Sequence, residues 1–377
     1  MEPRKAGGDR HDDAGICATG KNRWLPGTRR AWGQSWLLAD VGAADQAADK
    51  PIKADTIFRI YSMSKPVTSV AVMMLVEQGK IDIDVPVSEY LPELSNLKVL
   101  VVEGEGDDRK FKEVDAKRPT TARDLLRHTS GLTYGFFGSS EVDKRYLAAD
   151  ILYGNTVAET VTKLSKLPLK HQPGTRFEYS VSTDVLGRLV EVASGERFDR
   201  FLRTHIFAPL GMRDAFFNVP IEKLDRLAEM YAPDGNGLKP AAAQRSRRLV
   251  NPDNRFFSGG GGLCCTTRDD LRFCQMLLNG GMLDGKRIIN SETIAEMTKN
   301  QLGEEVRGRG GFQFGLGFAI SDRGVYSWGG AAGTRFWIDP VNQFIGIFMI
   351  QINPYGGRNY GDQMKTIVYR ALDGDKP

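Results

Sequence analysis

The clearest hydrophobic pattern in the chain runs from Ser62 to Gly79 and predicts a buried helix. Apolar residues recur there with the 3.6-residue period of a helix, and most positions between them are apolar too. A helix that is apolar nearly all round is buried. Pro66 is tolerated in the first turn, where the N–H that it lacks would be unpaired anyway, and Gly79 is a suitable stop. A short strand-like run, Thr56–Ile60, leads into this helix.

The middle of the chain alternates helical patterns with glycine and proline breaks, which predicts a mainly helical domain over residues 100–290. Thr121 and Asp124 form a capping pattern before Leu125, and His128–Gly131 ends that helix. Ser291 is predicted to cap one more short helix. The other helices predicted in this part are Thr183–Ala193, Phe198–Phe207 and Leu271–Leu278.

The C-terminal part changes to the short apolar runs that are typical of strands. Asp339–Asn342 is a turn signal between the last two runs, and the short connections favour an antiparallel meander. We therefore expect an α/β domain built from residues 51–99 and 291–377, with a closing helix at Gln363–Leu372. The predicted strands are Phe312–Ile320, Gly324–Trp328, Thr334–Ile338 and Phe344–Ile350.

Residues 1–50 show neither a helical nor an alternating apolar period. We expect this segment to be poorly defined, with regular structure beginning near Thr56.

The composition is that of an ordinary globular protein, with 377 residues, 41% of them hydrophobic and 26% charged. The 51 basic and 47 acidic side chains give a net charge of +4, which is too small to favour a nucleic-acid partner. The longest strongly apolar stretch, Val67–Val76, is too short to span a membrane, and Met1–Gly20 lacks a secretory signal pattern. We therefore expect a cytoplasmic protein.

The four cysteines form no CxxC pair or disulfide framework, and the four histidines form no metal-binding motif. We expect no metal and no other cofactor. The sequence leaves the oligomeric state open.

Ser62 and Lys65 are the first candidates for chemistry. A serine at a helix N-terminus lies among unpaired N–H groups, which stabilise negative charge that develops nearby. A lysine one turn later lies on the same face and can accept the serine proton if it is neutral. Ser95 and Lys98 have the same spacing but lie in a polar stretch after Pro92. The alternative for Ser62 is an ordinary helix cap.

Two further motifs complete the candidate site. Tyr179-Ser-Val181 lies between a turn and a predicted helix, where a tyrosine hydroxyl can relay a proton; the alternative is a packed core tyrosine. Trp328 is followed by Gly329 and Gly330, which would let a ligand lie against bare backbone; the alternative is a glycine bend behind a core tryptophan.

Two glycine patterns exclude other enzyme classes. Gly259–Gly262 lacks the lysine that would make it a phosphate-binding loop, and is better explained as a tight, exposed approach to the next helix. No Gly-x-Ser-x-Gly motif occurs, which argues against an α/β-hydrolase.

Taken in chain order, the Ser62, Tyr179 and Trp328 motifs resemble those of the serine β-lactamase and penicillin-binding-protein superfamily. The flanks Phe58–Pro66 and Leu125–Leu132 are similar to stretches that recur in class C β-lactamases and family VIII carboxylesterases. The resemblance covers most of the chain. It implies an α+β fold of the β-lactamase/DD-peptidase type, in which an antiparallel sheet is flanked by helices and joined to a mainly helical domain, with the active site between them.

The resemblance also implies roles for individual residues. Ser62 would be the acylated nucleophile, and Lys65 and Tyr179 would share the general-base and proton-relay roles. The backbone N–H groups of Ser62 and Ala331 would form the oxyanion hole. Trp328, Gly329, Gly330 and Val181 would line the substrate site.

Two departures from the β-lactamase pattern favour the esterase branch. Val181 stands where β-lactamases usually carry asparagine. Trp328 stands where they usually carry the lysine that helps to hold the β-lactam carboxylate. We therefore expect a carboxylesterase acting on small esters with short acyl chains. The alternatives are a β-lactamase or D-alanyl peptidase with side esterase activity, an acyltransferase, and a non-catalytic binding relative.

A third departure concerns the N-terminus. The family has two sheet strands before the Ser-x-x-Lys helix, and the sequence shows only what looks like the end of the second, Ala39–Gly42. One hypothesis is an altered or misread stretch upstream. If the strands were missing, the sheet would have an unprotected edge.

Overall fold

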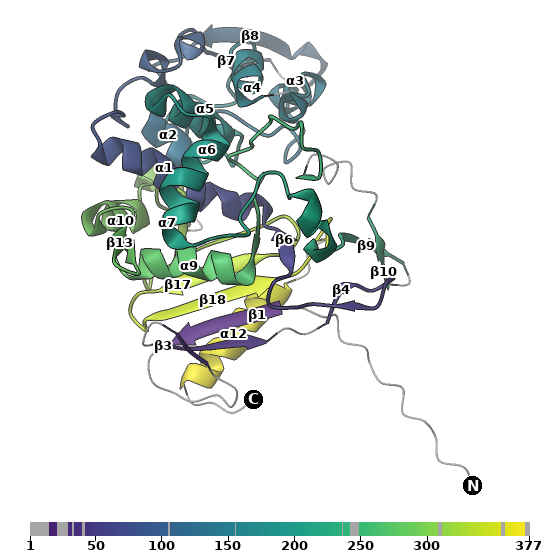
Figure 1. The fold of residues 1–377 in the computed structure, drawn as a ribbon. Helices are drawn as coiled ribbons and strands as arrows, with labels where there is room; N and C mark the ends of the chain where they lie inside the picture. Colours follow the sequence, from purple (N-terminus) through teal and green to yellow (C-terminus); the bar gives the residue numbers. More distant parts are fainter. Residues whose placement is uncertain are drawn as a thin grey trace.

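The computed structural model describes residues 15–20, 29–31, 34–39, 42–104, 106–154, 156–235, 237–241, 249–307, 311–355 and 359–373. Its main feature is an antiparallel sheet with the strand order β14-β15-β16-β17-β18-β1-β3-β2 (Figure 1). The predicted C-terminal meander is confirmed, because β14 to β18 pair in sequence order. The single strand predicted at Phe312–Ile320 was wrong, because the chain turns within it and forms two short strands that pair with each other. The strands are β1 Gly15–Gly20, β2 Arg29–Ala31, β3 Gln34–Ala39, β14 Gln313–Phe314, β15 Ala319–Ile320, β16 Tyr326–Gly329, β17 Arg335–Asp339 and β18 Phe344–Met349.

The N-terminal strands correct the expectation that regular structure begins near Thr56. Strand β1 pairs with β18 on one side and with β3 on the other, with Ala18 opposite Gly346 and Leu37. Strand β3 ends at Ala39, where the sequence suggested the end of a strand. An altered upstream sequence is therefore not needed to explain the sheet. Residues 1–14 and 21–28, about which the same expectation was made, lie outside the described residues.

The two faces of the sheet are covered by different helices. Along β17 and β18, Phe336 and Ile347 join the main hydrophobic core, whereas Trp337 and Phe348 join a smaller cluster with residues of α12. Helix α9 (Thr267–Leu278) contacts β18, β1 and β17, and α12 (Tyr360–Asp373) contacts β18. The alternation of side chains along a strand thus builds a core on each face.

A second, helical layer lies beyond α9 (Figure 1). Its centre is α5, which contacts α1, α2, α4 and α6. The predicted capping box of α2 is confirmed, since Thr121 and Asp124 exchange hydrogen bonds. The predicted serine cap at residue 291 was wrong, because Asn290 occupies the cap position and makes no side-chain cap bond. The helices are α1 Ser64–Glu77, α2 Ala122–Leu126, α3 Glu141–Ala148, α4 Val157–Leu164, α5 Ser182–Ser194, α6 Phe198–Leu202, α7 Ala208–Leu210, α10 Ser291–Thr298 and α11 Glu304–Arg307.

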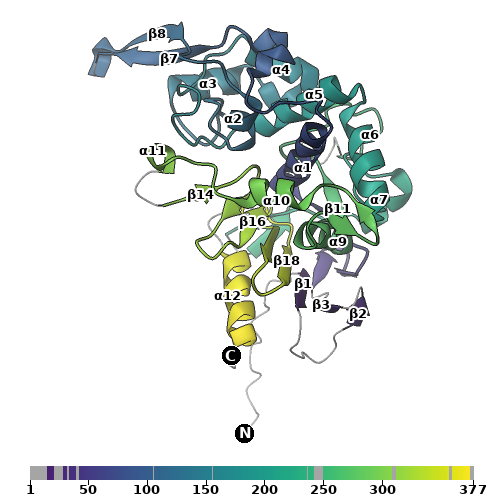
Figure 2. The ribbon, with the colours of Figure 1, turned by 90° about the vertical axis from the view of Figure 1, so that its left-hand side faces the viewer.

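Short elements connect these layers. Single-turn helices and one π-helical turn lie at η1 Tyr61–Met63, η2 Val87–Glu89, η3 Pro92–Leu94, η4 Gly106–Asp108, η5 Ile151–Tyr153, η6 Arg203–Phe207 and η7 Ile221–Arg226. Two-stranded pairs form between β4 Ala43–Asp45 and β5 Lys50–Pro51, β6 Ile57–Arg59 and β11 Cys264–Thr266, β7 Lys98–Glu103 and β8 Lys110–Asp115, β9 Tyr231–Asp234 and β10 Gly237–Pro240, and β12 Met282–Leu283 and β13 Lys286–Arg287. The β7–β8 hairpin projects from the helical layer (Figure 2).

The mixture of helices and antiparallel strands confirms the predicted α+β class. Within the described residues, no helix combines the length and apolar character that crossing a membrane requires.

Candidate active site

Ser62 lies in a tight turn between a strand and the buried helix. Strand β6 ends at Arg59, η1 follows, and α1 begins at Ser64. The cap of α1 is Met63, so Ser62 does not serve as the cap that the sequence left open as an alternative. Tyr61, just before Ser62, has a φ of 45°, which is unusual for a bulky residue.

Lys65 points its amine at Ser62 from the first turn of α1. The side chain is 1% exposed, and its Nζ lies 3.3 Å from Ser62 Oγ. The same Nζ donates hydrogen bonds to Tyr134 Oη at 2.9 Å and to the carbonyl oxygen of Gly260 at 2.6 Å. The two residues that the spacing paired are therefore in contact, and Lys65 is held in place by partners from two distant loops.

Tyr179 lies beside Lys65 with its ring rather than its hydroxyl. The Lys65 Nζ is 4.5 Å from the centre of the Tyr179 ring, within the range of a cation–π contact. Tyr179 also packs against Tyr134, with 5.5 Å between ring centres, and against Trp328 at 5.4 Å. His128 completes this group at 4.9 Å from Tyr179.

His128 is held in its neutral form by its surroundings. Burial, and to a smaller extent the positive charge of Lys65, lowers the pKa of His128 well below 6.5. Its Nδ1 lies 3.4 Å from Ser180 Oγ. Because the His128 imidazole is neutral, it adds no positive charge beside Lys65.

Asp184 fixes the glycine loop that supports Lys65. Its Oδ1 accepts hydrogen bonds from Ser258 Oγ at 2.5 Å and from the N–H of Gly260 at 3.2 Å. Burial raises the pKa of Asp184, while the hydrogen bond from Ser258 and the charge of Lys65 act in the opposite direction. A Cβ on Gly260 would lie 2.6 Å from Asp184 Oδ2 and 2.8 Å from Tyr134 Oη, so only glycine fits.

This loop differs from the sequence-based expectation in two ways. Gly259 and Gly260 are buried, not exposed, and Gly259–Gly262 leads into strand β11 before any helix. The loop packs against the start of α5, where the Thr183 carbonyl oxygen occupies the space that a Cβ on Gly259 would need. The glycines allow this close approach and place the Gly260 carbonyl against Lys65.

The Trp328–Ala331 segment lies next to the turn that carries Ser62, because strand β16 contacts η1. Trp328 is half-buried and packs on Tyr179 and Phe314. A Cβ on Gly330 would lie 2.1 Å from Thr334 Oγ1 and 2.4 Å from the carbonyl oxygen of Ile60. The space beside Gly330 is thus filled by protein, and the glycine lets strand β16 approach the segment that carries Ser62.

A cavity of about 470 Å³ opens beside Ser62. Ser62, Tyr179 and Ala331 line it, and Ala331 is exposed. Trp328, Gly329 and Gly330 are not among its lining residues, and Val181 is fully buried in the main hydrophobic core. Much of the wall is aromatic, formed by Tyr134, Phe136, Phe137, Tyr179, Phe217 and Phe256.

Sequence reasoning missed Tyr134, Asp184 and Gly260 as partners of the site. Tyr134 is far from Lys65 in sequence, so no local spacing could connect them. A signal did exist in the aromatic run Tyr134–Phe137 and in the four glycines that follow Ser258. The glycines were interpreted only as a tight, exposed approach to the next helix.

Comparisons with known proteins show the family to which the chain belongs. The family model described as Beta-lactamase matches residues 28–366. Protein Rv1367c of Mycobacterium tuberculosis is 34% identical over 349 residues, which cover 86% of this chain and 84% of that protein. Esterase EstB of Burkholderia gladioli is 30% identical over 332 residues, covering 79% of this chain and 78% of that protein.

A solved structure is similar over nearly the whole chain. EstCE1, described as a hydrolase with promiscuous acyltransferase activity, superposes with a TM-score of 0.78 at 24% identity, covering 95% of this chain and 93% of that one. The fold is therefore that of the β-lactamase and penicillin-binding-protein group. With a matching family model over most of its length, the chain belongs to the Beta-lactamase family, a family of serine hydrolases.

Proposed function

We propose that the protein is a carboxylesterase that hydrolyses esters with short acyl chains through an acyl-enzyme on Ser62. The observation that carries the proposal is the 3.3 Å contact between Ser62 Oγ and the buried Lys65 Nζ at the wall of an aromatic cavity. A nucleophile beside a base that other groups orient is the arrangement that covalent catalysis needs. Tyr134 and Gly260 orient the base here.

In the first step, Ser62 Oγ attacks the carbonyl carbon of the ester. Its proton passes to Lys65 Nζ, which acts as the base, and the carbonyl oxygen takes up the negative charge. The N–H groups of Ser62 and Ala331 would donate hydrogen bonds to this oxygen. When the carbon–oxygen bond to the alcohol breaks, Lys65 and Tyr179 return a proton to the leaving oxygen, and the acyl group stays on Ser62.

In the second step, water attacks the acyl carbon. The water proton passes to the Tyr179–Lys65 pair, the bond to Ser62 Oγ breaks, and Ser62 regains a proton. The products are the carboxylic acid and the free enzyme. The same groups act as base and then as acid in both halves of the reaction.

An ester fits the site better than a β-lactam does. Trp328 occupies the position at which β-lactamases usually carry the lysine that helps to hold the β-lactam carboxylate. Its half-buried ring packs on Tyr179 and supports an apolar wall instead of a charged one. Named relatives support the ester reading, since one is Esterase EstB and another is the lovastatin esterase of Penicillium rubens.

The test compares the wild type with Ser62→Ala on p-nitrophenyl butyrate and nitrocefin. We expect the variant to lose ester turnover while it unfolds at the same temperature as the wild type. Equal rates for the two proteins on the ester would disprove the proposal. Faster turnover of nitrocefin than of the ester would assign the site to β-lactam chemistry.

Acyl transfer is the same chemistry with an alcohol in place of water. A relative from Penicillium decumbens is named Acyltransferase calJ, which gives this alternative its support. Adding an alcohol to the ester assay and measuring the new ester separates transfer from hydrolysis.

A further inference from the structure

The cavity beside Ser62 carries polar groups away from its aromatic wall. Two neighbouring segments, one containing Arg59 and the other containing Gln351, supply these polar groups. The N–H of Arg59 donates to Gln351 Oε1 at 3.0 Å, and Gln351 Nε2 donates back to the Arg59 carbonyl at 3.1 Å. Two residues further along each segment, Asn353 Nδ2 donates to Tyr61 Oη at 3.4 Å. Arg59, Tyr61 and Asn353 all line the cavity.

Arg59 is the unusual member of this group. The residue is 6% exposed, and its guanidinium makes one hydrogen bond to the described residues, from Nη1 to the carbonyl oxygen of Ala228 at 2.5 Å. Its Nε is buried and finds no hydrogen-bond partner in the described ranges. A guanidinium has five N–H donors, so most of its capacity is unused.

No carboxylate among the described residues pairs with Arg59. Other arginines differ: Arg118 and Arg123 are more exposed, yet each forms an ion pair, with Asp124 and Asp84 respectively. A buried charge without a counter-charge is costly. Of the described residues lining the cavity, Arg59 is the one basic side chain and Asp184 the one acidic side chain. Asp184 is held by Ser258 and Gly260, on the Lys65 side.

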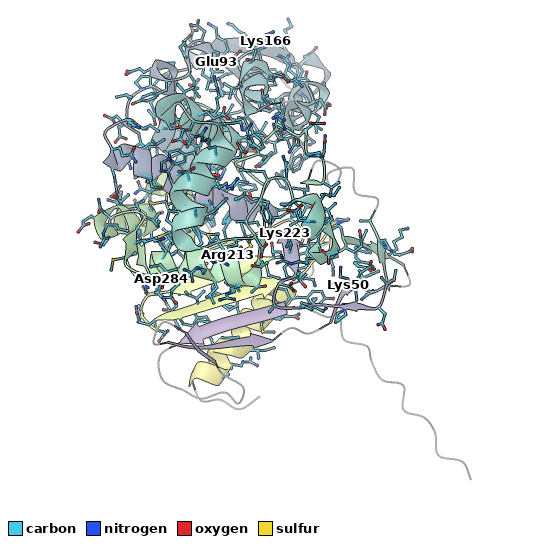
Figure 3. All side chains as sticks on the ribbon, in the orientation of Figure 1. Lys50, Glu93, Lys166, Arg213, Lys223 and Asp284 are labelled. Atoms are coloured by element: carbon cyan, nitrogen blue, oxygen red, sulfur yellow. The ribbon has the colours of Figure 1, made fainter. Side chains whose placement is uncertain are left out.

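A second hollow in the molecule differs in that its unpaired cations are exposed. It has a volume of about 800 Å³ and is lined by residues that include Arg213, Lys223 and Asp284 (Figure 3). Lys223 is paired with Asp214 and Arg272 with Asp284. Arg203, Arg213 and Lys286 line the hollow without an ion pair among the described residues, but they are exposed to water, whereas Arg59 is buried. The unpaired cation in the active-site cavity is therefore the stronger sign of a ligand.

We infer that Arg59 is an anion-binding residue of the active-site cavity, and that the natural ester carries a carboxylate on its acyl chain. This inference rests on the proposed esterase function. A guanidinium binds a carboxylate through two parallel hydrogen bonds, and the pairing is strong where water is excluded. Because Arg59 is three residues before Ser62, their Cα atoms are at most roughly 10 Å apart. A substrate of modest length can therefore reach both.

The test compares two esters that differ in one charge. The first is the mono-p-nitrophenyl ester of adipic acid, which has a free carboxylate, and the second is its methyl ester, which is neutral. The measured quantity is the ratio of the two kcat/KM values for the wild type, Arg59→Gln and Arg59→Lys. Using the ratio cancels any change in activity that the two esters share.

We expect the wild type to favour the charged ester and Arg59→Gln to lose this preference by about ten- to a hundredfold, the usual effect of a charged hydrogen bond. Arg59→Lys should keep part of it, because lysine retains the charge but not the planar pair of donors. A wild-type ratio near one, or a ratio unchanged in Arg59→Gln, would overturn the inference.

A second measurement needs no variant, in case Arg59→Gln does not fold. Hexanoate and hexanamide are compared as inhibitors of neutral-ester hydrolysis by the wild type. Hexanoate should bind about tenfold more tightly or better; equal inhibition would count against the inference. The two levels of failure are distinct: absence of Ser62-dependent turnover of the neutral ester rejects the esterase function, whereas normal turnover without a charge preference rejects only the role of Arg59.

Discussion

The amine of Lys65 lies 2.9 Å from the hydroxyl of Tyr134 and 4.5 Å from the centre of the Tyr179 ring. The two tyrosines thus contact the same amine in different ways. Tyr134 accepts a hydrogen bond from it and holds it, whereas the Tyr179 hydroxyl makes no hydrogen bond to the described residues, which leaves it available for the proton relay that we propose.

Replacing each tyrosine by phenylalanine tests this division. Tyr179→Phe should lower kcat by about 10²- to 10⁴-fold, the usual contribution of a general acid–base group. Tyr134→Phe should lower it less, by about tenfold, because Lys65 keeps the Gly260 carbonyl as a partner. Tyr146→Phe is the matched control, since the Tyr146 hydroxyl is buried and has no hydrogen-bond partner in the part of the chain that the structure describes. A larger loss in Tyr134→Phe than in Tyr179→Phe would transfer the relay role to Tyr134.

The backbone at Tyr61 predicts an unusual order of stability. Its φ of 45° suits glycine and strains other residues by about 1 kcal/mol. Tyr61→Gly should therefore be more stable than Tyr61→Ala by about that amount in urea unfolding. In helix α4, at the exposed Thr162, the order should reverse, with alanine more stable than glycine. The same order at both positions would show that the turn at Tyr61 carries no strain.

Substitution of Gly330 should lower activity by displacing the backbone. A Cβ there would collide with the carbonyl oxygen of Ile60 and with Thr334 Oγ1, next to the segment that carries Ser62. Gly330→Ala should therefore lower kcat/KM by at least about tenfold. Gly329→Ala is the neighbouring control, because its nearest contact would be 3.2 Å. Equal rates for the two variants on p-nitrophenyl butyrate would contradict the packing argument.

Because of Asp270, we expect the stability of the protein to depend on pH. Burial, reinforced by the neighbouring charge of Asp269, raises the pKa of Asp270 to about 7, and its Oδ2 has no hydrogen-bond partner among the described residues. The raised pKa of Asp270 does not change the free energy of unfolding below the unfolded pKa of 3.8. As the pH rises above this value the protein loses stability, and the loss is complete above about pH 7. Asp270→Asn should therefore stabilise the protein at pH 8, by up to about 4 kcal/mol, and have little effect at pH 4.

Asp124→Asn is the control of opposite sign. Burial alone would raise the pKa of Asp124, but the hydrogen bonds and charge of Arg118, the Thr121 N–H and the charge of Arg127 together outweigh it and lower this pKa. The contribution of Asp124 to stability is therefore present above the unfolded pKa. Between pH 4 and 8 this variant should be destabilised by a nearly constant amount. Thermal unfolding of both variants and the wild type across this range provides the measurement. A stabilisation by Asp270→Asn that did not grow with pH would rule out ionisation as its cause.

The sequence predicted the parts of the fold and site whose signals are local. The spacing of Ser62 and Lys65, the capping box at Thr121 and the C-terminal meander each depend on residues close together in the chain, and each is present in the structure. The partners of Lys65 were not predictable in this way. Tyr134 and Gly260 come from loops that only the folded chain brings together.

The N-terminal strands were not predicted from the sequence for a related reason. Strand β1 is held by pairing with β18 and β3, and this pairing sets its conformation without a strong local pattern. The glycines after Trp328 were interpreted as room for a ligand because sequence shows the missing side chain but not its neighbour. At Gly330 the neighbour is the Ile60 carbonyl.

The pairing of β1 with β18 also has a consequence for how the chain is made. Gly15 lies opposite Met349, so β1 cannot complete its pairing until β18, which is synthesised much later, is available. Closing so long a loop is entropically costly and slow. The emerging chain can form the helical layer and the β1–β3 pair on the ribosome, but the sheet remains open along one side of β1 until β18 leaves the exit tunnel. We therefore expect the protein to become active only after β18 has left the exit tunnel and paired with β1.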